Sequence, residues 1–467
     1  MLTTAEARVL VATVHAMRPP MHAPDFAALR AREFARLDAE AHAYLDYTGS
    51  ALYPESLVTA HTAMLRECVL GNPHAESPAS LASSALIAEA KAHLLSFLDA
   101  DPSEYAVAFT ANASAALGLV AESWRFGKGA PLVLTADNHN SVNGIREYAR
   151  RAGAPVHYLP LDGELRLDTP MERLVAFRHS HQHHGLFAFP AQSNFSGVKH
   201  PLSLVQTAQS LGYRVVLDAA ALVPTARLSL RDVPADFVAL SFYKMFGYPT
   251  GVGALVARKS ALEELRRPWF SGGTVEYVSV QHGTHALRDG AEGFEDGTAN
   301  FLSIGAVPAG LSFLESMGLP NVERHVVGHA MTLIDELRAL RHRNGRPLVR
   351  IYGPLDDVNR GATVAFNILH ESGSVVPYAA VEERARLARV SVRGGCFCNP
   401  GASEAAFGFP AELTAKCMAS TQASGWSIPR FAACMGGYAV GAVRASFGIA
   451  SNSHDVQRLV TVVESFV

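Results

Sequence analysis

One lysine of this chain stands where it could react with an aldehyde. Lys244 follows the apolar run DFVALSFY (236–243) and precedes the glycine-rich turn GYPTGVG (247–253). Asp218 directly follows a second apolar run (213–217), 26 residues upstream of the lysine. An amine can form a Schiff base with pyridoxal phosphate, and a carboxylate can keep the ring nitrogen of that cofactor protonated. The pair therefore suits this cofactor, although Lys244 by itself fits a solvated lysine at a strand end equally well.

The elements that must position these residues recur in a regular order. Apolar runs of strand length are separated mostly by helical or loop segments, at 105–110, 131–136, 155–160, 186–190, 213–217, 236–243 and 251–257. This alternation predicts an α/β fold with a mainly parallel, seven-stranded sheet covered on both faces. Ligands of such sheets bind beyond the carboxyl ends of the strands, so the residues after each run are the candidates for a site.

The chain is long enough for two domains. We expect a large domain over 46–310, which holds the apolar runs. From about residue 311 onward, a long helix (321–340) and a strand (362–368) indicate a smaller α+β domain. We assign 311–467 to this domain, together with the N-terminal segment 1–45.

Small or polar residues follow three of the other runs. Ala113 and Ser114 stand where a helix opens, so backbone N–H groups and a hydroxyl could hold a phosphate there. His139 could lie flat on a pyridine ring, and Asn194 could donate to a phenolate oxygen. Each signal is weak alone, because small residues commonly open helices and a lone histidine is more often a polar loop residue. Together with the lysine and the aspartate they form a consistent set.

Composition excludes several classes of protein. The chain has 467 residues, 49% of them hydrophobic, so it can bury a sizeable core. A formal net charge of −3 without long charge runs argues against nucleic acid or an anionic membrane as partner. The sequence shows neither an apolar run of membrane-spanning length nor a signal peptide, so we expect a cytoplasmic protein. Five cysteines, an odd number, indicate reduced thiols rather than a disulfide framework.

Longer stretches carry a resemblance that runs nearly from end to end. They are YLDYTGSALY at 44, LGNPH at 70, FTANASAALGLVAE at 109, DNHNSV at 137, FPAQSNFSGVKHPLS at 189, LDAAALVPT at 217, SFYKMFGYPTGVGAL at 241, FEDGT at 294, RGGCFCNPGA at 393 and VRASFG at 443. The chain resembles the class V aminotransferase family of pyridoxal-phosphate enzymes, and within it most the cysteine desulfurase domain of molybdenum cofactor sulfurases. The resemblance implies fold type I of these transferases and pyridoxal 5'-phosphate as the cofactor.

The resemblance also implies roles around the cofactor ring. Lys244 would bind the cofactor covalently and later shuttle the proton, and Asp218 would pair with the pyridine nitrogen. His139 would stack on the ring, and Asn194 would lie by its hydroxyl and by the substrate.

Further roles concern the phosphate and the substrate. By resemblance, Ala113, Ser114 and Ser241 would hold the phosphate. Thr298 would reach the phosphate site of the neighbouring subunit, which implies a homodimer. Arg444 would bind the substrate carboxylate, a task suited to a planar fork of donors. Without the resemblance, a surface ion pair would be the simpler interpretation of Arg444.

Cys398 would carry the sulfur. The motif RGGCFCNPGA places it where the family has a nucleophilic cysteine on a mobile loop. With L-cysteine as substrate, Lys244 would remove the α proton, and the Cys398 thiolate would attack the substrate sulfur, leave a persulfide and release alanine. Only a thiolate does this, so we expect an exposed cysteine near a positive charge, with His139 or Arg393 as candidates. Cys396 remains an alternative nucleophile, a resolving thiol or a second acceptor.

Two metal interpretations compete with this one. Cys396, Cys398, Cys417 and Cys434 could bind a metal, but the CxC step lacks the usual paired spacing. A histidine cluster could do so as well, although a polar loop before the next strand explains it more simply; its members are His179, His181, His183 and His184. We therefore expect no metal.

The sequence departs from the family pattern at several positions. Ala221 replaces a glutamine and Tyr243 a histidine common in other desulfurases, and both changes occur in the sulfurase subgroup; Tyr47, Thr48 and Ser403 also differ from the pattern. Long sulfurases continue into a further domain, whereas this sequence ends at 467, so we expect the sulfur acceptor to be another protein or a small molecule.

Three functional hypotheses remain open. The first is an L-cysteine desulfurase. The second is another class V enzyme acting on a related amino acid, such as a C–S lyase, an epimerase or an aminotransferase, which would not use Cys398. The third is an inactive sulfur-relay scaffold, against which the intact set of candidate residues argues.

Overall fold

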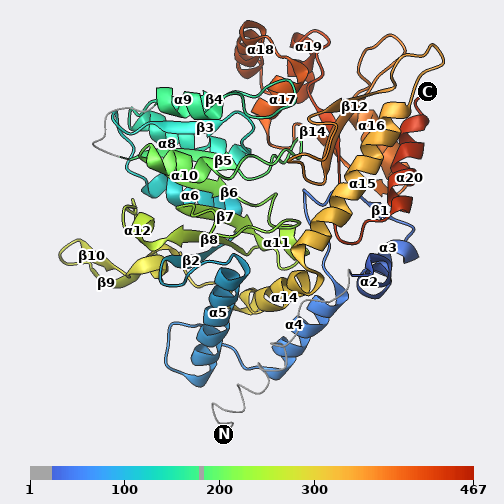
Figure 1. The fold of residues 1–467 in the computed structure, drawn as a ribbon. Helices are drawn as coiled ribbons and strands as arrows, with labels where there is room; N and C mark the ends of the chain where they lie inside the picture. Colours follow the sequence, from blue (N-terminus) through green and yellow to red (C-terminus); the bar gives the residue numbers. More distant parts are fainter. Residues whose placement is uncertain (1–23, 178–183) are drawn as a thin grey trace.

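A seven-stranded sheet forms the centre of the computed structural model, which describes residues 24–177 and 184–467 (Figure 1). Its strands are β2 (Tyr105–Thr110), β3 (Leu132–Thr135), β4 (Val156–Leu159), β5 (Gly185–Pro190), β6 (Tyr213–Asp218), β7 (Phe237–Ser241) and β8 (Gly253–Arg258). They lie in the order β2-β8-β7-β6-β5-β3-β4. Within this sheet β8 is antiparallel to both of its neighbours, and the other pairs are parallel. The predicted α/β class with a mainly parallel sheet is confirmed.

Helices bury both faces of this sheet. Successive side chains of a strand point to opposite faces, so Leu132 and Leu134 join one core while Val133 joins the other. Each fully buried side chain of this size contributes about 1.5–3 kcal/mol, which explains why the strands are apolar throughout. Helices α6 (Ala113–Ser123) and α8 (Ile145–Arg151) cover the first face, and α9 (Pro170–Ala176) and α10 (Leu204–Ser210) cover the second.

The sheet region carries further elements at its periphery. They are α4 (Glu55–Glu67), α5 (Pro78–Phe97), α7 (Asn140–Asn143), α11 (Phe242–Phe246), α12 (Lys259–Leu262), the hairpin β9 (Val275–Ser279) and β10 (Thr284–Leu287), the 3₁₀ turn η1 (Gly290–Phe294), α13 (Phe301–Ile304) and α14 (Val307–Met317). The hairpin projects from the body of the molecule (Figure 1).

A second, smaller sheet lies towards the C-terminus. Its antiparallel strands follow the order β11-β12-β15-β14, with β11 (Val349–Tyr352), β12 (Thr363–Ile368), β14 (Arg393–Gly395) and β15 (Ala442–Ser446). Helices α15 (Leu319–Ala339), α16 (Tyr378–Leu387) and α20 (Ser453–Glu464) accompany it (Figure 1).

The described part of the N-terminal segment contacts this second region. It contains α2 (Phe26–Glu33), α3 (Arg36–Ala39) and β1 (Ala43–Tyr44), and β1 pairs in parallel with β13 (Val390–Ser391). Arg30 bonds Asp455 at 2.7 Å, and both side chains are buried. The domain boundaries at residues 46 and 311 stay a prediction.

A helical lobe follows the cysteine motif. It comprises α17 (Pro400–Phe407), α18 (Ala411–Ala423) and α19 (Ile428–Cys434), and a disulfide joins Cys417 to Cys434. The prediction of reduced thiols is therefore wrong for these two residues. The two helices pack against each other and bring the Cα atoms to 5.6 Å, well within the span of a disulfide, and an odd cysteine count cannot reveal such a pairing. We call 411–434 the disulfide lobe.

The described helices give little sign of a membrane span. None of them is both long and apolar enough to cross a bilayer alone. The segments Phe301–Met317 and Leu319–Ala339 reach that length and composition only as a pair, which is bent by 73°. Both segments contribute buried residues to the core, such as Leu311 and Leu333.

Candidate active site

Loops at the carboxyl ends of five strands enclose a polar cavity of about 130 Å³. This is the edge of the sheet at which parallel strands place their ligand-binding residues. The candidate residues that line it follow β2, β3, β5, β6 and β7; they are Ala113, Ser114, His139, Asn194, Asp218, Ser241 and Lys244. The fold thus brings together seven residues that lie far apart in the sequence.

Lys244 lies on the short helix α11 rather than at the end of a strand. Strand β7 ends at Ser241, and α11 ends at Phe246 and is capped by Gly247, whose φ of 75° favours glycine. A Cβ atom at Gly247 would also lie 2.4 Å from the backbone of Leu52 and Tyr53. The side chain of Lys244 reaches the cavity, where surrounding protein lowers its pKa from the ordinary value, an effect that the charge of Asp218 opposes.

Asp218 and His139 line the same cavity as this amine. Asp218 is 8% exposed and accepts a hydrogen bond from the backbone N–H of Ala220 at 3.0 Å. His139 Nδ1 accepts from the N–H of Ser141 at 3.1 Å, which fixes the ring. Burial lowers the pKa of His139, against the opposing charge of Asp218, so the imidazole is neutral at neutral pH.

The N-terminus of α6 supplies hydrogen-bond donors at one end of the cavity. Asn112 caps this helix by accepting from the N–H of Ala115 at 3.0 Å. Ala113 N–H donates to Ser241 Oγ at 2.8 Å, and the hydroxyls of Ser114 and Ser141 lie 2.6 Å apart. The hydroxyls of Ser114 and Ser141, together with the N-terminus of an 11-residue helix, suit the binding of an anion.

These residues fit pyridoxal phosphate. The Lys244 amine has no hydrogen-bond partner among the described residues, although it borders a polar cavity. The fit has four parts: Lys244 to bind the aldehyde, Asp218 for the ring nitrogen, His139 for the ring face and the start of α6 for the phosphate.

Arg444 binds a carboxylate of the protein itself. Its guanidinium donates to Asp46 Oδ1 at 3.0 Å and to the backbone oxygen of Asn194 at 3.0 Å. Asp46 also accepts from Arg393, with Nη2 at 2.5 Å. Gly49 leaves room for this cluster, because a Cβ atom there would lie 2.7 Å from both Asp46 and Arg393. Arg444 is 2% exposed, so the surface ion pair considered from sequence does not exist.

The loop that carries Cys398 lies over the cavity edge. Asn140 N–H donates to the carbonyl of Cys398 at 2.7 Å, and Asn194 Nδ2 donates to the carbonyl of Phe397 at 2.7 Å. Asn399 Nδ2 donates to Asn194 Oδ1 at 2.8 Å. Phe397 and Cys398 both have left-handed backbone angles, with φ of 57° and 56°. Cys398 is exposed, as a sulfur carrier requires, and Cys396 is half-buried.

Aromatic rings connect this loop to the disulfide lobe. Phe397 packs against Phe195 with centroids 5.3 Å apart, and Phe195 contacts Phe407 at 6.2 Å. Phe407 contacts Phe409 at 5.8 Å, and Phe409 contacts Phe431 of α19 at 6.3 Å. At the other end of this row of aromatic rings, the guanidinium of Arg444 lies 4.8 Å from the centroid of the Phe397 ring.

Thr298 lies outside this cavity. It borders a separate cavity of about 500 Å³ and accepts a hydrogen bond from Asn72 at 3.2 Å. Within its own chain it is therefore not part of the set around Lys244, and its role towards a neighbouring subunit stays a prediction.

Sequence reasoning missed four residues of the site. Asp46 lies in the motif YLDYTG, where a carboxylate in an otherwise apolar stretch is the available signal. Asn399 caps α17 by accepting from the N–H of Ala402, and the Asn-Pro pair marks such a cap. Phe397 and Gln192 have no local signal, because their importance arises from contacts with distant residues.

The described residues contain no cluster of three or more side chains suited to a metal ion. The four-cysteine alternative loses two ligands to the disulfide between Cys417 and Cys434. Of the histidine cluster, His179, His181 and His183 lie outside the described residues, and His184 contacts Glu264 at 3.4 Å.

Comparison with known proteins establishes the family. The family Aminotransferase class-V matches residues 43–459. The chain belongs to the class-V aminotransferase family. It is 36% identical to the molybdenum cofactor sulfurase of Solanum lycopersicum over 94% of this chain and 56% of that protein. The molybdenum cofactor sulfurase of Bos taurus is 35% identical over 92% of this chain and 50% of its own length. The chain thus spans about half the length of these curated relatives.

Solved structures show the same fold. The apo cysteine desulfurase of Thermococcus onnurineus superposes with a TM-score of 0.78 at 24% identity, covering 96% of this chain and 99% of that one. A cysteine desulfurase of Escherichia coli gives 0.75 at 21% identity, covering 95% and 99%. The expected fold type I is confirmed by this likeness.

Proposed function

We propose that this class-V protein is a pyridoxal-phosphate-dependent L-cysteine desulfurase that collects sulfur as a persulfide on Cys398. The observation that carries the proposal is the joint position of two reactive groups. The Lys244 amine lies in the polar cavity, and the exposed Cys398 is held at the edge of that cavity by hydrogen bonds from Asn140 and Asn194. Similarity to sulfurases and desulfurases supports the same chemistry.

In this proposal each residue has a defined task. Pyridoxal phosphate, when bound, supplies an electron sink for the α carbon of the substrate. The Lys244 amine, with its pKa lowered by burial, accepts the α proton of L-cysteine and returns a proton later. Asp218 would hold the charge on the ring nitrogen of the cofactor, and neutral His139 would cover its ring. Arg444 binds the substrate carboxylate once Asp46 gives way.

Cys398 completes the transfer. Its thiolate attacks the sulfur of the substrate, which forms a sulfur–sulfur bond and breaks the bond between that sulfur and Cβ. The electron pair of the broken bond stays with the Cβ carbon, which is then protonated. The products are a Cys398 persulfide and L-alanine. Because the site is a loop open to solvent, the persulfide is accessible to a separate acceptor, either a protein or a small molecule.

Single-turnover product analysis tests the proposal. Purified protein loaded with pyridoxal phosphate is mixed with L-cysteine, and alanine and protein-bound persulfide are measured in wild type and Cys398→Ala. We expect about one alanine and one persulfide per site in wild type and the loss of both in the variant. Cys396→Ala is the matched control and should retain both products. If Cys396→Ala loses them instead, Cys396 is the carrier.

A second outcome would change the class of reaction. If the loaded protein makes no alanine from L-cysteine, or Cys398→Ala is unimpaired, the desulfurase proposal fails. The other class-V activities considered from sequence, a C–S lyase, an epimerase or an aminotransferase on a related amino acid, need Lys244 and Asp218 but not Cys398.

We also infer a homodimer. Trp269, Tyr277 and Val280 are exposed apolar residues on or near the projecting hairpin, beside the cavity that Thr298 borders. An apolar surface of this kind supports association of two copies. Light scattering on the purified chain tests this, and a monomer at micromolar concentration would refute it. A cytoplasmic location also stays a prediction.

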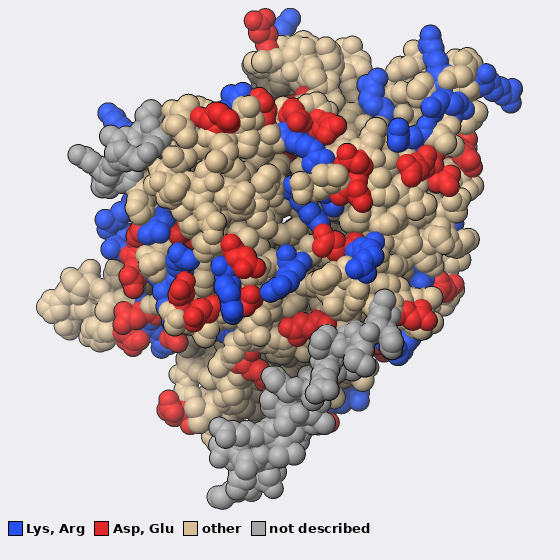
Figure 2. All heavy atoms as spheres, in the orientation of Figure 1, with Lys and Arg blue, Asp and Glu red and all other residues tan. Residues whose placement is uncertain are grey.

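The charge pattern on one face of the molecule does not indicate a nucleic-acid-binding surface there. On the face drawn in Figure 2, side chains of both signs are interspersed over the body of the molecule. A long single-sign stripe, which nucleic-acid binding requires, is not visible on that face.

A further inference from the structure

Gln192 holds an unpaired acceptor beside the reactive lysine. The residue is 3% exposed, and its Oε1 atom is buried without a hydrogen-bond partner among the described residues. Buried acceptors are nearly always paired, so an orphaned one requires an explanation. The amide borders both the cavity described above and a smaller one of about 40 Å³ on the other side of Lys244.

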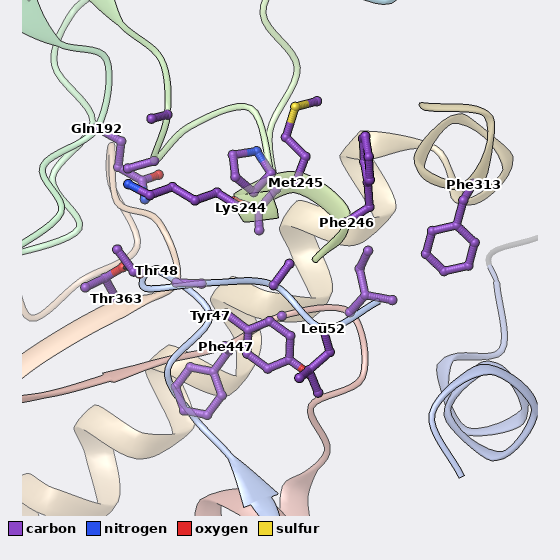
Figure 3. Close-up of a pocket in the computed structure, with 18 of the residues that line it drawn as sticks. Tyr47, Thr48, Leu52, Gln192, Lys244, Met245, Phe246, Phe313, Thr363 and Phe447 are labelled. Atoms are coloured by element: carbon purple, nitrogen blue, oxygen red, sulfur yellow. Dashed lines mark hydrogen bonds between the residues drawn. The ribbon is translucent and has the colours of Figure 1, made fainter. Parts of the chain in front are cut away.

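One donor of this cavity wall with the complementary deficit is the lysine. The Lys244 amine is a donor without a partner in the described part of the chain, and it borders the same two cavities. Figure 3 shows the Gln192 side chain, from the turn after β5, and the Lys244 side chain, from α11, pointing towards one another. An unpaired acceptor and an unpaired donor thus border the same two cavities, without a hydrogen bond between them in this structure.

The residues around Gln192 leave space for its side-chain amide beside Lys244. A Cβ atom at Gly361 would lie 2.1 Å from Gln192 Oε1, so a side chain there would displace the amide from its present position. Ala220 and Ala221, which border the same cavity, are too small to fill the space or to offer a competing hydrogen bond. The backbone around Gln192 is fixed as well, since its bridge to Lys199 closes the turn.

We propose that Gln192 is a positioning residue for Lys244, and that rotation of its side chain lets Oε1, which is unbonded in this structure, accept a hydrogen bond from the lysine amine when that amine is free. This inference rests on the proposed function, in which the amine is released during each turnover. It gives Gln192 the task of keeping the free amine aimed at the substrate. An acceptor stabilises the ammonium form more than the neutral amine, so it also tunes the fraction of neutral amine.

The pH dependence of cofactor capture tests this directly. The full chain is freed of cofactor, and the rate at which it captures pyridoxal phosphate is followed by absorbance from pH 6 to 10. Only the neutral amine reacts, so the rate profile breaks at the pKa of Lys244. Asp218, His139, Arg393, Cys398 and Arg444 also face this amine, and they are the same in every protein compared.

Two substitutions of nearly equal shape should move this break in opposite directions. Gln192→Met removes the acceptor and should shift the break down by about one pH unit. Gln192→Glu adds a negative charge and should shift it up by about one unit or more. A residue that only fills space would give no shift, or the same direction in both variants, and either result overturns the proposal.

Controls separate this inference from the function on which it rests. Lys244→Ala should show no capture, and Gln457→Met, at an exposed position on α20, should behave as wild type. If wild type itself captures no cofactor, the proposed function fails. If capture is normal but the break does not move, only the role of Gln192 fails. Should the methionine variant not fold by circular dichroism, the glutamate variant decides alone, because an unmoved break there refutes the proposal.

Discussion

The lysine side and the cysteine side of the site are built differently. Lys244, Asp218 and Ser241 follow strands that are buried on both faces, so the central sheet fixes their positions. Cys398 instead lies on an exposed loop with left-handed backbone angles, held by a few hydrogen bonds and a row of aromatic rings. Proton transfer needs fixed geometry, whereas sulfur delivery needs a group that can reach out. We call Lys244, Asp218 and Ser241 the rigid half of the site, and the loop that carries Cys398 its adjustable half.

Removing the lysine should have the largest effect. Lys244→Ala deletes both the covalent anchor and the proton acceptor, so alanine formation from L-cysteine should fall by about 10³-fold or more. The absorbance of the lysine-bound cofactor should vanish as well. The rigid half should otherwise stay intact, so Cys398 should react with iodoacetamide at the wild-type rate. A changed alkylation rate would show that the two halves are not independent.

Asp46 tests the contact between the two halves. Asp46→Asn leaves the buried Arg444 without its charged partner, and loss of one member of a buried pair costs about 3 kcal/mol. Urea unfolding at neutral pH measures this loss. Glu323→Gln breaks the half-exposed pair with Lys199 and serves as control, with an expected cost below about 1 kcal/mol. Equal losses in the two variants would contradict the assigned role of Asp46.

Phe397 tests the adjustable half alone. Phe397→Ala removes the ring that lies between Phe195 and Arg444, so the loop should be held less firmly. We expect alkylation of Cys398 to change several-fold and cofactor capture by Lys244 to stay within about twofold of wild type. Phe397→Leu, which keeps most of the volume, should restore much of the wild-type rate. A parallel loss of cofactor capture would mean that the loop also shapes the rigid half.

The disulfide should have the smallest effect on the lysine side. Replacing both Cys417 and Cys434 by serine opens a link with a sequence separation of 17 residues, which stabilises by about 3 kcal/mol in the chain-entropy treatment. Proteolysis within the disulfide lobe should accelerate, because that lobe has only a small core of its own. Cofactor capture should remain unchanged. Replacing the free, exposed Cys68 by serine provides the control.

The rigid half was also the predictable half. Seven apolar runs gave seven strands, and the rule that ligands bind at the carboxyl ends of strands located Lys244, Asp218 and Asn194 in one cavity. The pattern misplaced Lys244 only locally, because Phe242 and Tyr243 continue the apolar run but start a helical turn. Short apolar runs cannot distinguish a strand end from such a turn.

The adjustable half depends on contacts that no local pattern encodes. The pairing of Asp46 with Arg444 joins residues almost 400 positions apart, and the aromatic row joins four separate segments. Asn194 was predicted to face the cofactor and substrate; it lines the cavity, and its side chain also bonds the cysteine loop. Which partner a polar side chain takes is decided by packing, not by its position in the sequence.

The pairing of Asp46 with Arg444 also affects which substrates bind. A substrate carboxylate must replace the Asp46 carboxylate at the Arg444 guanidinium. Asp46 already pairs with Arg444 in this structure, so an incoming carboxylate gains only the difference between two similar pairs. The apparent affinity is the intrinsic one reduced by the fraction of molecules whose arginine is free. A thiol amine without a carboxylate cannot replace Asp46 at Arg444. Cysteamine should therefore leave the ion pair between Asp46 and Arg444 intact and yield no persulfide on Cys398. Persulfide formation from cysteamine would show that this ion pair does not select the substrate.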